Sequence, residues 1–286
     1  MEFDEIKKKI DKYLKDYFYK RDGYNKLLYE AMGYSINVGG KRIRPMLMIL
    51  TYSMYKSDYE KIMPMAAAME MIHTYSLIHD DLPCMDNDDM RRGKPSNHKI
   101  FGDAVALLAG DGLLNEAFNS MLQCQIESDL KIKVMSIISK ASSADGMIGG
   151  QIVDIINENR KIEKEQLEYM HNKKTGELIT ASIVSGAIMG GAQECEQNIL
   201  LEYGKVLGLA FQIQDDILDV EGDKEKMGKN THMDENKSTF VNVYGLDKCK
   251  SMLASLEEQC KELINSLKGD TKKIMEITNM LFKRQY

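Results

Sequence analysis

The distribution of proline constrains the fold of this chain more than any other feature. The sequence holds four prolines, the last of them Pro95, and residues 96–286 contain none. Because proline interrupts helices and is frequent in turn-rich β folds, this distribution favours long helices. Near the N-terminus, Phe3, Ile6 and Ile10 recur at steps of three and four residues, as on one face of an amphipathic helix. The sequence therefore predicts an all-α fold.

The same periodicity predicts where the helices lie. The first is expected to run from residue 3 to near the break at residues 21–23. The others are expected at residues 26–34, 45–55, 66–80, 103–122, 131–142, 146–158, 163–170, 178–192 and 196–220. The tail, residues 240–286, is expected to form two amphipathic helices broken near Gly269. Because no clear linker and no repeat of fixed period divides the sequence, we expect one domain over residues 1–286.

Composition narrows the class of protein. The formal net charge of −6 argues against nonspecific binding of nucleic acid. The five cysteines are scattered and never spaced as CxxC, which argues against a disulfide framework or a zinc site. The N-terminus lacks the apolar core of a signal peptide, and the longest uncharged run, 178–193, is shorter than the roughly 20 residues of a membrane span. We expect a cytoplasmic enzyme with no membrane span.

Two acidic clusters, far apart in the sequence, each end an apolar segment. They are Asp80, Asp81 and Asp86 in DDLPCMD, and Asp215, Asp216 and Asp219 in FQIQDDILD. On a helix the three downstream carboxylates share one face, and like charges about 4 Å apart repel by roughly 4 kcal/mol at an effective dielectric of 20. Upstream, Pro83 interrupts the helix and can return Asp86 to the side of Asp80. Hard oxygen ligands select Mg²⁺, whereas the soft thiol of Cys84 does not suit it. Either cluster alone could instead be a solvated loop.

Three basic patches accompany the acids: residues 39–45 (GGKRIRP), Arg91 and Arg92 with Lys94, and residues 173–176 (KKTG). Backbone amides and guanidinium forks at a helix start bind phosphate well. Arginine beside metal-binding acids suits a diphosphate held partly by each. Taken singly, the first patch could be a solvated turn and the last a simple helix junction.

In chain order, the motifs GGKRIRP, DDLPCMD with RRG, KTG, FQIQDDILD and GK resemble those of the trans-isoprenyl diphosphate synthases, the family of farnesyl and geranylgeranyl diphosphate synthases. The resemblance runs from about residue 24 to the C-terminus. It implies long helices around a central cavity, a homodimer, and two aspartate motifs that face each other across the cavity mouth. It also implies that isopentenyl diphosphate condenses with dimethylallyl or geranyl diphosphate after metal-assisted ionisation of the allylic C–O bond.

The resemblance also assigns roles to residues. The six aspartates named above would bind about three Mg²⁺ together with the allylic diphosphate. The phosphates of that substrate would contact Arg91, Lys174 and Lys229. Isopentenyl diphosphate would be held by Lys41, Arg44, His73 and Arg92. The catalytic set would be Asp80, Asp81, Lys174, Thr175, Gln212 and Asp215, with Thr175 and Gln212 directing oxygen dipoles toward the carbocation. Without the resemblance, His73 fits a core histidine equally well.

Product length is expected to depend on Tyr75 and Ser76. Tyr75 stands five residues before Asp80, about 7.5 Å of helix rise, where its ring could floor the cavity. The spacer in DDLPCMD resembles the longer form found in bacterial farnesyl and plant geranylgeranyl synthases. In the family an aromatic residue at this position accompanies the fifteen-carbon product, so we expect farnesyl diphosphate, with geranylgeranyl diphosphate as the alternative. Tyr75 could also simply pack in the core.

Part of the sequence departs from the family pattern. The loop after Gly228-Lys229 is shorter than usual, and His232 stands where glycine is common, so Asp234 and Lys237 receive no role. The tail Arg284-Gln285-Tyr286 only partly resembles the basic tail that closes over substrate, and it receives none either. A class I terpene cyclase would show a different second metal motif, and a non-catalytic prenyl-synthase-like subunit could lose an acidic motif. Both acidic motifs are intact here.

Overall fold

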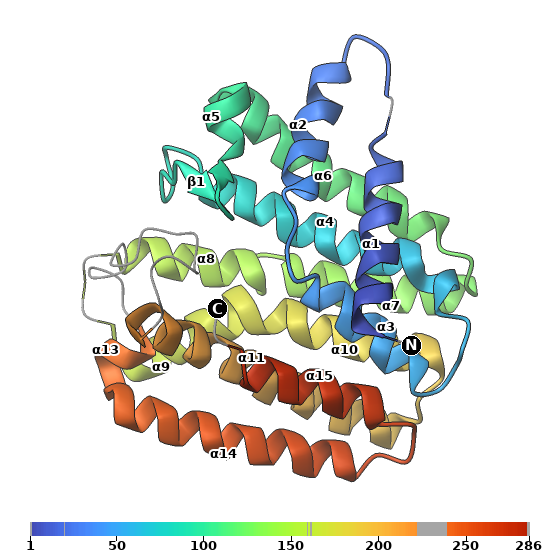
Figure 1. Cartoon of the computed structure of the whole chain (residues 1–286), viewed down its shortest axis with the longest axis vertical. Helices are drawn as coiled ribbons and strands as arrows, with labels where there is room; N and C mark the ends of the chain where they lie inside the picture. The colour runs from blue at the N-terminus through green and yellow to red at the C-terminus, as the bar shows by residue number, and fades with distance from the viewer. Residues whose placement is uncertain (1, 20, 159, 161, 222–238, 285–286) are drawn as a thin grey trace. The chain divides into compact units, whose positions relative to one another are not determined.

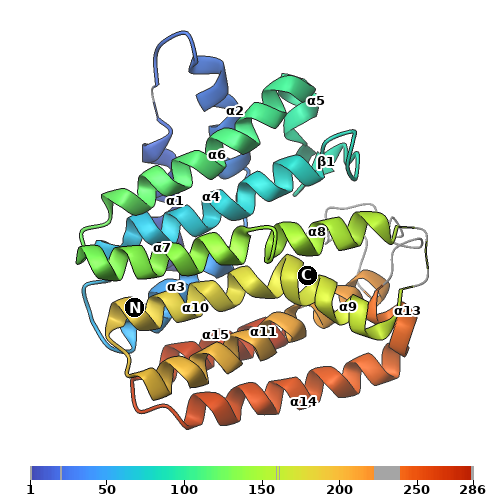
Figure 2. The ribbon, with the colours of Figure 1, turned by 180° about the vertical axis from the view of Figure 1, so that it is seen from behind.

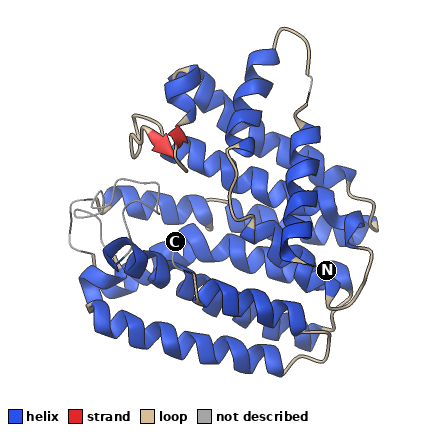
Figure 3. Cartoon of the chain, viewed as in Figure 1, coloured by secondary structure: helices blue, strands red, loops and turns tan. Residues whose placement is uncertain are grey.

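A computed structural model of the protein describes residues 2–19, 21–158, 160, 162–221 and 239–284. Its helices are α1 (Phe3–Tyr17), α2 (Lys26–Asn37), α3 (Ile43–Ser53), η1 (Tyr59–Ile62), α4 (Met63–Asp80), α5 (Asn97–Phe101), α6 (Asp103–Gln123), α7 (Ser128–Ser142), α8 (Met147–Ile156), α9 (Lys164–His171), η2 (Asn172–Gly176), α10 (Glu177–Gly190), α11 (Glu194–Glu221), α13 (Phe240–Tyr244), α14 (Leu246–Asn265) and α15 (Lys272–Phe282) (Figure 1). Within these described ranges, the strands are β1 (Met90–Arg91) and β2 (Lys94–Pro95), which form one short antiparallel hairpin (Figure 3). The predicted all-α fold is confirmed.

The predicted helices up to residue 221 all correspond to helices, with ends that differ by a few residues. The tail is different: it holds three helices rather than two, because Gly245 separates α13 from α14. Gly245 has φ of 82°, in the left-handed region that glycine adopts without a steric penalty. The predicted break near Gly269 is confirmed, since it lies between α14 and α15.

Contacts between Cα atoms divide the chain into two compact units. Unit 1 comprises residues 1–49 and 58–135, and unit 2 comprises residues 50–57 and 136–286. Among the described residues, no helix combines the length and the hydrophobicity that crossing a membrane requires.

Helix α4 is the centre of unit 1 and packs along α6 (Figure 2). It is apolar on nearly every side, and its alanines and methionines, such as Ala67 and Met71, are fully buried. The helix begins with proline in its first turn, where the missing N–H costs no hydrogen bond, and ends at Asp80. An interior helix of this kind holds its C-terminal acids in a fixed position.

Helix α11 is the centre of unit 2 and packs against α10 and α14. Its Tyr203 is fully buried, and the hydroxyl group lies 2.8 Å from Thr278 Oγ1 on α15. Ile213 packs with Leu167 of α9 and Phe240 of α13 in one apolar cluster. The end of α11 that carries the second acidic motif is therefore supported by the surrounding helices of its own unit.

Candidate active site

The first acidic motif forms a tight turn at the end of α4. The chain turns back after Pro83, so that the Asp86 N–H donates to the Asp80 carbonyl oxygen at 2.9 Å. This confirms, for the backbone, the prediction that Asp86 returns beside Asp80. The side chains of Asp80 and Asp86 are half-buried, whereas Asp81 is only 3% exposed.

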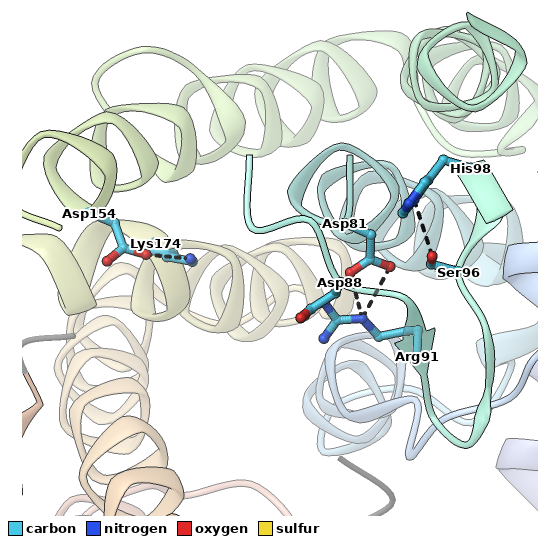
Figure 4. Close-up of polar contacts among 7 residues, drawn as sticks. All are labelled: Asp81, Asp88, Arg91, Ser96, His98, Asp154 and Lys174. Carbon is cyan, nitrogen blue, oxygen red and sulfur yellow. Dashed lines mark hydrogen bonds and ion pairs between the residues drawn. The ribbon is translucent and has the colours of Figure 1, made fainter. Parts of the chain in front are cut away.

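Asp81 is held by an arginine fork from the β1–β2 hairpin (Figure 4). Arg91 Nε donates to Asp81 Oδ1 at 3.0 Å, and Arg91 Nη2 donates to the same oxygen and to Asp88 Oδ2. Arg91 and Arg92 also line a small pocket that includes Asp81 and Thr74. The hairpin therefore brings two predicted phosphate contacts to the first acidic motif, as the sequence spacing indicated.

The glycine-opened turn before α3 is fitted closely around Arg92. Arg92 Nη1 donates to the Gly39 carbonyl oxygen. Gly40 has φ of 144°, a backbone conformation that residues with a side chain rarely adopt, and a Cβ atom there would lie 2.6 Å from Arg92 Nη1, so a side chain would also displace this guanidinium group. The turn and the hairpin, which are about fifty residues apart in the sequence, thus form one cationic surface in unit 1.

One of the three cations in that turn points into the protein interior. Arg42 is buried and makes charge-assisted hydrogen bonds to Glu70 Oε1 (2.7 Å) and Asp11 Oδ1 (2.8 Å), and a third bond to the Ile36 carbonyl oxygen (2.7 Å). Its φ of 54° is unusual for a residue with a side chain. Arg42 is therefore a structural anchor, whereas its neighbours Lys41 and Arg44 are exposed and half-buried, respectively.

The charges of these cations act on His73. Burial lowers the pKa of His73 well below its usual value, and the charges of Arg44, Arg92 and Arg91 lower it further. The imidazole is therefore neutral at pH 7 and can donate one hydrogen bond and accept another. The structure brings together Arg44, His73 and Arg92, three of the four residues predicted to hold isopentenyl diphosphate, in a region of concentrated positive charge.

Tyr75 lies inside unit 1, one turn before the acids. It is 5% exposed, its ring meets His79 edge to face at 5.7 Å, and its hydroxyl group has no hydrogen-bond partner among the described residues. Burial, and to a smaller extent the charge of Asp80, raise the pKa of Tyr75 to about 12. Ser76 Oγ donates to the His73 carbonyl oxygen at 2.9 Å. The control of product length by Tyr75 and Ser76 stays a prediction.

In unit 2, the KKTG patch forms the π-helical segment η2 rather than an ordinary helix start. Lys174 Nζ lies 2.7 Å from Asp154 Oδ2 of α8 (Figure 4). Thr175 Oγ1 donates to Gln212 Oε1 at 3.0 Å, so the two residues predicted to stabilise the carbocation are in contact. Single π-helical turns inside helices occur often at functional sites, which favours the functional interpretation of this patch over a simple helix junction.

The three acids of α11 differ in their surroundings. Asp216 is 4% exposed and accepts hydrogen bonds from Gln212 Nε2 (2.9 Å) and the Phe240 N–H (2.7 Å). Burial raises the pKa of Asp216 to about 7, with Asp215 and Asp219 adding to the effect. Asp219 is exposed and the Asp215 side chain is 43% exposed, so these two carboxylates are the more accessible.

No group of three or more His, Cys, Asp or Glu side chains in the described ranges is arranged as a complete metal cage. Magnesium does not require one, because it keeps several waters and usually takes one or two carboxylates with substrate phosphates. The hard oxygen donors of Asp80 with Asp86, and of Asp215 with Asp219, fit that mode of binding. Cys84 is exposed and offers a thiol that does not suit this ion.

Sequence reasoning missed several partners of the predicted residues. Glu70 and Asp154 are single acids in strongly apolar stretches, a pattern that could have indicated buried ion pairs. Asp11 gave no such signal, because it lies on an amphipathic helix rich in charge. The predicted phosphate contact Lys229, together with Asp234 and Lys237, lies outside the described residues.

Fold and site together define an all-α protein that presents clustered carboxylates and guanidinium groups at the ends of buried helices, an arrangement for binding diphosphate groups with metal ions. A sequence model of the family described as polyprenyl synthetase matches residues 25–281. The chain belongs to the polyprenyl synthetase family.

Individual relatives agree with this assignment. The farnesyl diphosphate synthase of Bacillus subtilis is 39% identical over 285 residues, which cover 98% of this chain and 96% of the relative. The chloroplastic geranylgeranyl pyrophosphate synthase of Catharanthus roseus is 42% identical over 240 residues, 82% of this chain and 67% of the relative. A crystal structure of the Helicobacter pylori geranyltransferase, complexed with magnesium and isoprenyl diphosphate, has a TM-score of 0.89 at 32% identity and covers 98% of this chain and 94% of that chain. These findings confirm the predicted family, fold and enzyme class, a prenyltransferase.

Proposed function

We propose that this protein condenses isopentenyl diphosphate head to tail with dimethylallyl or geranyl diphosphate to give farnesyl diphosphate and diphosphate. The observation that carries the proposal is the pocket at the acidic turn of α4, where Arg91 and Arg92 lie beside Asp81. Their charges, with that of Arg44, also lower the pKa of the nearby His73. Cations that bind phosphate stand there next to carboxylates that bind magnesium, which is the chemistry that an ionising diphosphate substrate requires.

In this reaction, isopentenyl diphosphate is held by Lys41, Arg44, His73 and Arg92. Guanidinium forks hold its phosphate oxygens in pairs and fix their direction, which orients the attached alkene. Arg42 supports this arrangement from below, because its three hydrogen bonds fix the turn that carries Lys41 and Arg44.

The acids of the two motifs would hold about three Mg²⁺, and Arg91, Lys174 and Lys229 would contact the phosphates of the allylic substrate. The ions would supply positive charge that stabilises the departing diphosphate. Arg91 pairs with Asp81 and Lys174 pairs with Asp154, so each cation is positioned near a carboxylate of its own unit. Asp216 supports Gln212 and the start of α13.

Thr175 and Gln212 direct oxygen dipoles toward the allylic carbocation. Their mutual hydrogen bond of 3.0 Å holds both side chains, and the bond from Gln212 to Asp216 fixes the amide orientation, with its nitrogen toward Asp216. A dipole fixed before the reaction stabilises a developing charge without reorganising. The final proton goes to the released diphosphate, and no protein base is needed.

Farnesyl diphosphate is the proposed product because the buried ring of Tyr75 occupies the interior five residues before Asp80. Geranylgeranyl diphosphate is the second candidate, which the likeness to a geranylgeranyl pyrophosphate synthase favours. The two candidates differ by one further condensation, so they separate by product mass.

We also propose that the protein is a cytoplasmic, single-domain homodimer. The dimer follows the pattern of the family, and the exposed leucines of α6, Leu107 (47%), Leu108 (56%) and Leu122 (58%), are the residues we expect at its interface. Light scattering after gel filtration measures the assembly; a mass near the 32.6 kDa of one chain contradicts the dimer.

The reaction is tested by incubating the purified protein with Mg²⁺, isopentenyl diphosphate and either allylic primer, followed by mass spectrometry of the products. We expect farnesyl diphosphate as the main product, and none when EDTA is added. The absence of any condensation product with both primers would refute the proposed function.

A further inference from the structure

The last described residue of the chain, Arg284, lies against the second acidic motif. Arg284 Nη2 is 2.7 Å from Asp215 Oδ1 and also donates to the Phe211 carbonyl oxygen at 2.7 Å. The guanidinium group lies over the Phe211 ring, 3.8 Å from its centroid. The Arg284 side chain is only 9% exposed, so this cation is enclosed and is held on one turn of α11 from several directions.

The backbone of the tail is fixed at the same place. Gln214 Nε2, also on α11, donates to the carbonyl oxygens of Phe282 (3.0 Å) and Arg284 (3.1 Å). Two independent contacts, one through a side-chain amide and one through the guanidinium group, therefore hold residues 282–284 beside Asp215. Arg284 therefore has a defined binding position on α11, unlike a pair of exposed surface charges.

The surroundings of Arg284 do not provide a partner for every hydrogen-bond donor of its guanidinium group. Arg284 Nε is buried and has no hydrogen-bond partner among the described residues. Burial lowers the pKa of Arg284, while the charge of Asp215 acts in the opposite direction. Burying a guanidinium group with an unmade hydrogen bond is costly, and the carboxylate of Asp215 offsets that cost. The position of Arg284 on α11 is therefore stable only while the Asp215 carboxylate is available as its ion-pair partner.

We propose that Arg284 is a counter-cation of Asp215 when no metal is bound and competes with magnesium for this carboxylate, so that it lowers the metal affinity of the second acidic motif. The inference rests on the proposed function, in which Asp215 is a magnesium ligand. A carboxylate oxygen that accepts from a guanidinium group must give up that bond to ligate Mg²⁺ directly, at about 2.0–2.1 Å. Two cations at one carboxylate also repel each other. Metal binding at Asp215 thus releases Arg284.

The test measures metal binding without turnover. Manganese, which can occupy magnesium sites, is titrated into substrate-free protein, and electron paramagnetic resonance reports the free ion. Arg284→Met keeps an apolar side chain on Phe211 but removes the charge. The Arg284→Met variant should show a half-saturating manganese concentration about fivefold lower than that of the wild type. This is the lower end of the coupling that is typical between two bound species. We expect the lower end because Asp215 is partly exposed, so solvent screens its charge. Arg284→Gln should shift binding in the same direction.

The matched control is Lys283→Met, which removes one positive charge from the adjacent, exposed position. It should leave the half-saturating concentration unchanged. Circular dichroism melting of every variant establishes that the comparison is between folded proteins. Unchanged or weaker manganese binding in both Arg284 variants overturns the competition. Asp215→Asn separates this failure from that of the proposed function: if it binds manganese as the wild type does, the assignment of Asp215 as a metal ligand fails, and the inference fails with it.

Discussion

The buried pair of Arg42 and Glu70 makes a prediction about stability that can be worked out from the structure. Both side chains are 2% exposed, and the Nη1 to Oε1 distance is 2.7 Å. Glu70→Leu would leave the guanidinium group buried with Asp11 as its remaining carboxylate partner. Removing one member of a buried pair typically costs about 3–5 kcal/mol. Because Asp11 still compensates part of the charge, we expect the lower end, about 3 kcal/mol.

The assay is equilibrium unfolding in urea, followed by circular dichroism. With a slope of about 3 kcal/mol per molar urea, a loss of about 3 kcal/mol lowers the unfolding midpoint by about 1 M. The double variant Arg42→Met/Glu70→Leu removes both charges, and it should regain most of the lost stability, since apolar residues can replace a buried ion pair at little cost.

A surface pair provides the control. Glu60 is 57% exposed and pairs with Lys9 at 2.9 Å, so Glu60→Gln should cost less than about 1 kcal/mol. The reasoning is refuted if Glu70→Leu is no more destabilising than Glu60→Gln, or if the double variant is as unstable as the single one. Either result would mean that the burial of Arg42 does not determine the stability of this turn.

The remaining predictions concern product length, catalysis and pH. Tyr75→Ala should shift the product toward longer prenyl chains, measured by mass spectrometry. An active variant with an unchanged product distribution would show that Tyr75 does not limit the length of the product. Asp81→Ala and Asp215→Ala should each lower kcat at least about 100-fold, because charge stabilisation on the leaving diphosphate is lost; near-normal turnover contradicts the metal assignment. For Asp216, the folded-state pKa of about 7 lies above its usual value of 3.8. The folded, metal-free protein therefore binds more protons than the unfolded chain between about pH 4 and 7, and stability falls as pH rises through this window. Asp216→Asn should reduce the decrease in urea midpoint between pH 5 and 8 measured in EDTA, and an identical decrease in both proteins argues against the raised pKa.

Much of the site could be predicted because local sequence determines it. Pro83 necessarily interrupts α4, so the return of Asp86 toward Asp80 follows from the chain itself. The long proline-free stretch and the apolar periodicity likewise predicted the helices. Arg42 could not be assigned correctly, because a basic turn gives no indication of which cation points inward; its buried partner Glu70 lies 28 residues away. Tertiary packing decides such cases.

The contact of Arg284 with Asp215 shows the same limit. Its two members are 69 residues apart in the printed sequence, and no local pattern links the tail to α11. The π-helical form of η2 was also beyond sequence reasoning, since a lysine pair before Thr175 is compatible with an ordinary helix start. The residue types indicate a chemistry for the site that stays a prediction, whereas the ion pairs that position those residues could be found only in the folded structure.

The central claim, that the cations around His73 hold isopentenyl diphosphate, is tested most directly by steady-state kinetics of Arg44→Gln with each substrate varied in turn. Loss of a charge-assisted contact to one substrate should raise the KM for isopentenyl diphosphate by at least about tenfold. The KM for geranyl diphosphate should stay within about twofold of the wild-type value. A variant whose KM rises only for geranyl diphosphate, or for neither substrate, would contradict the account.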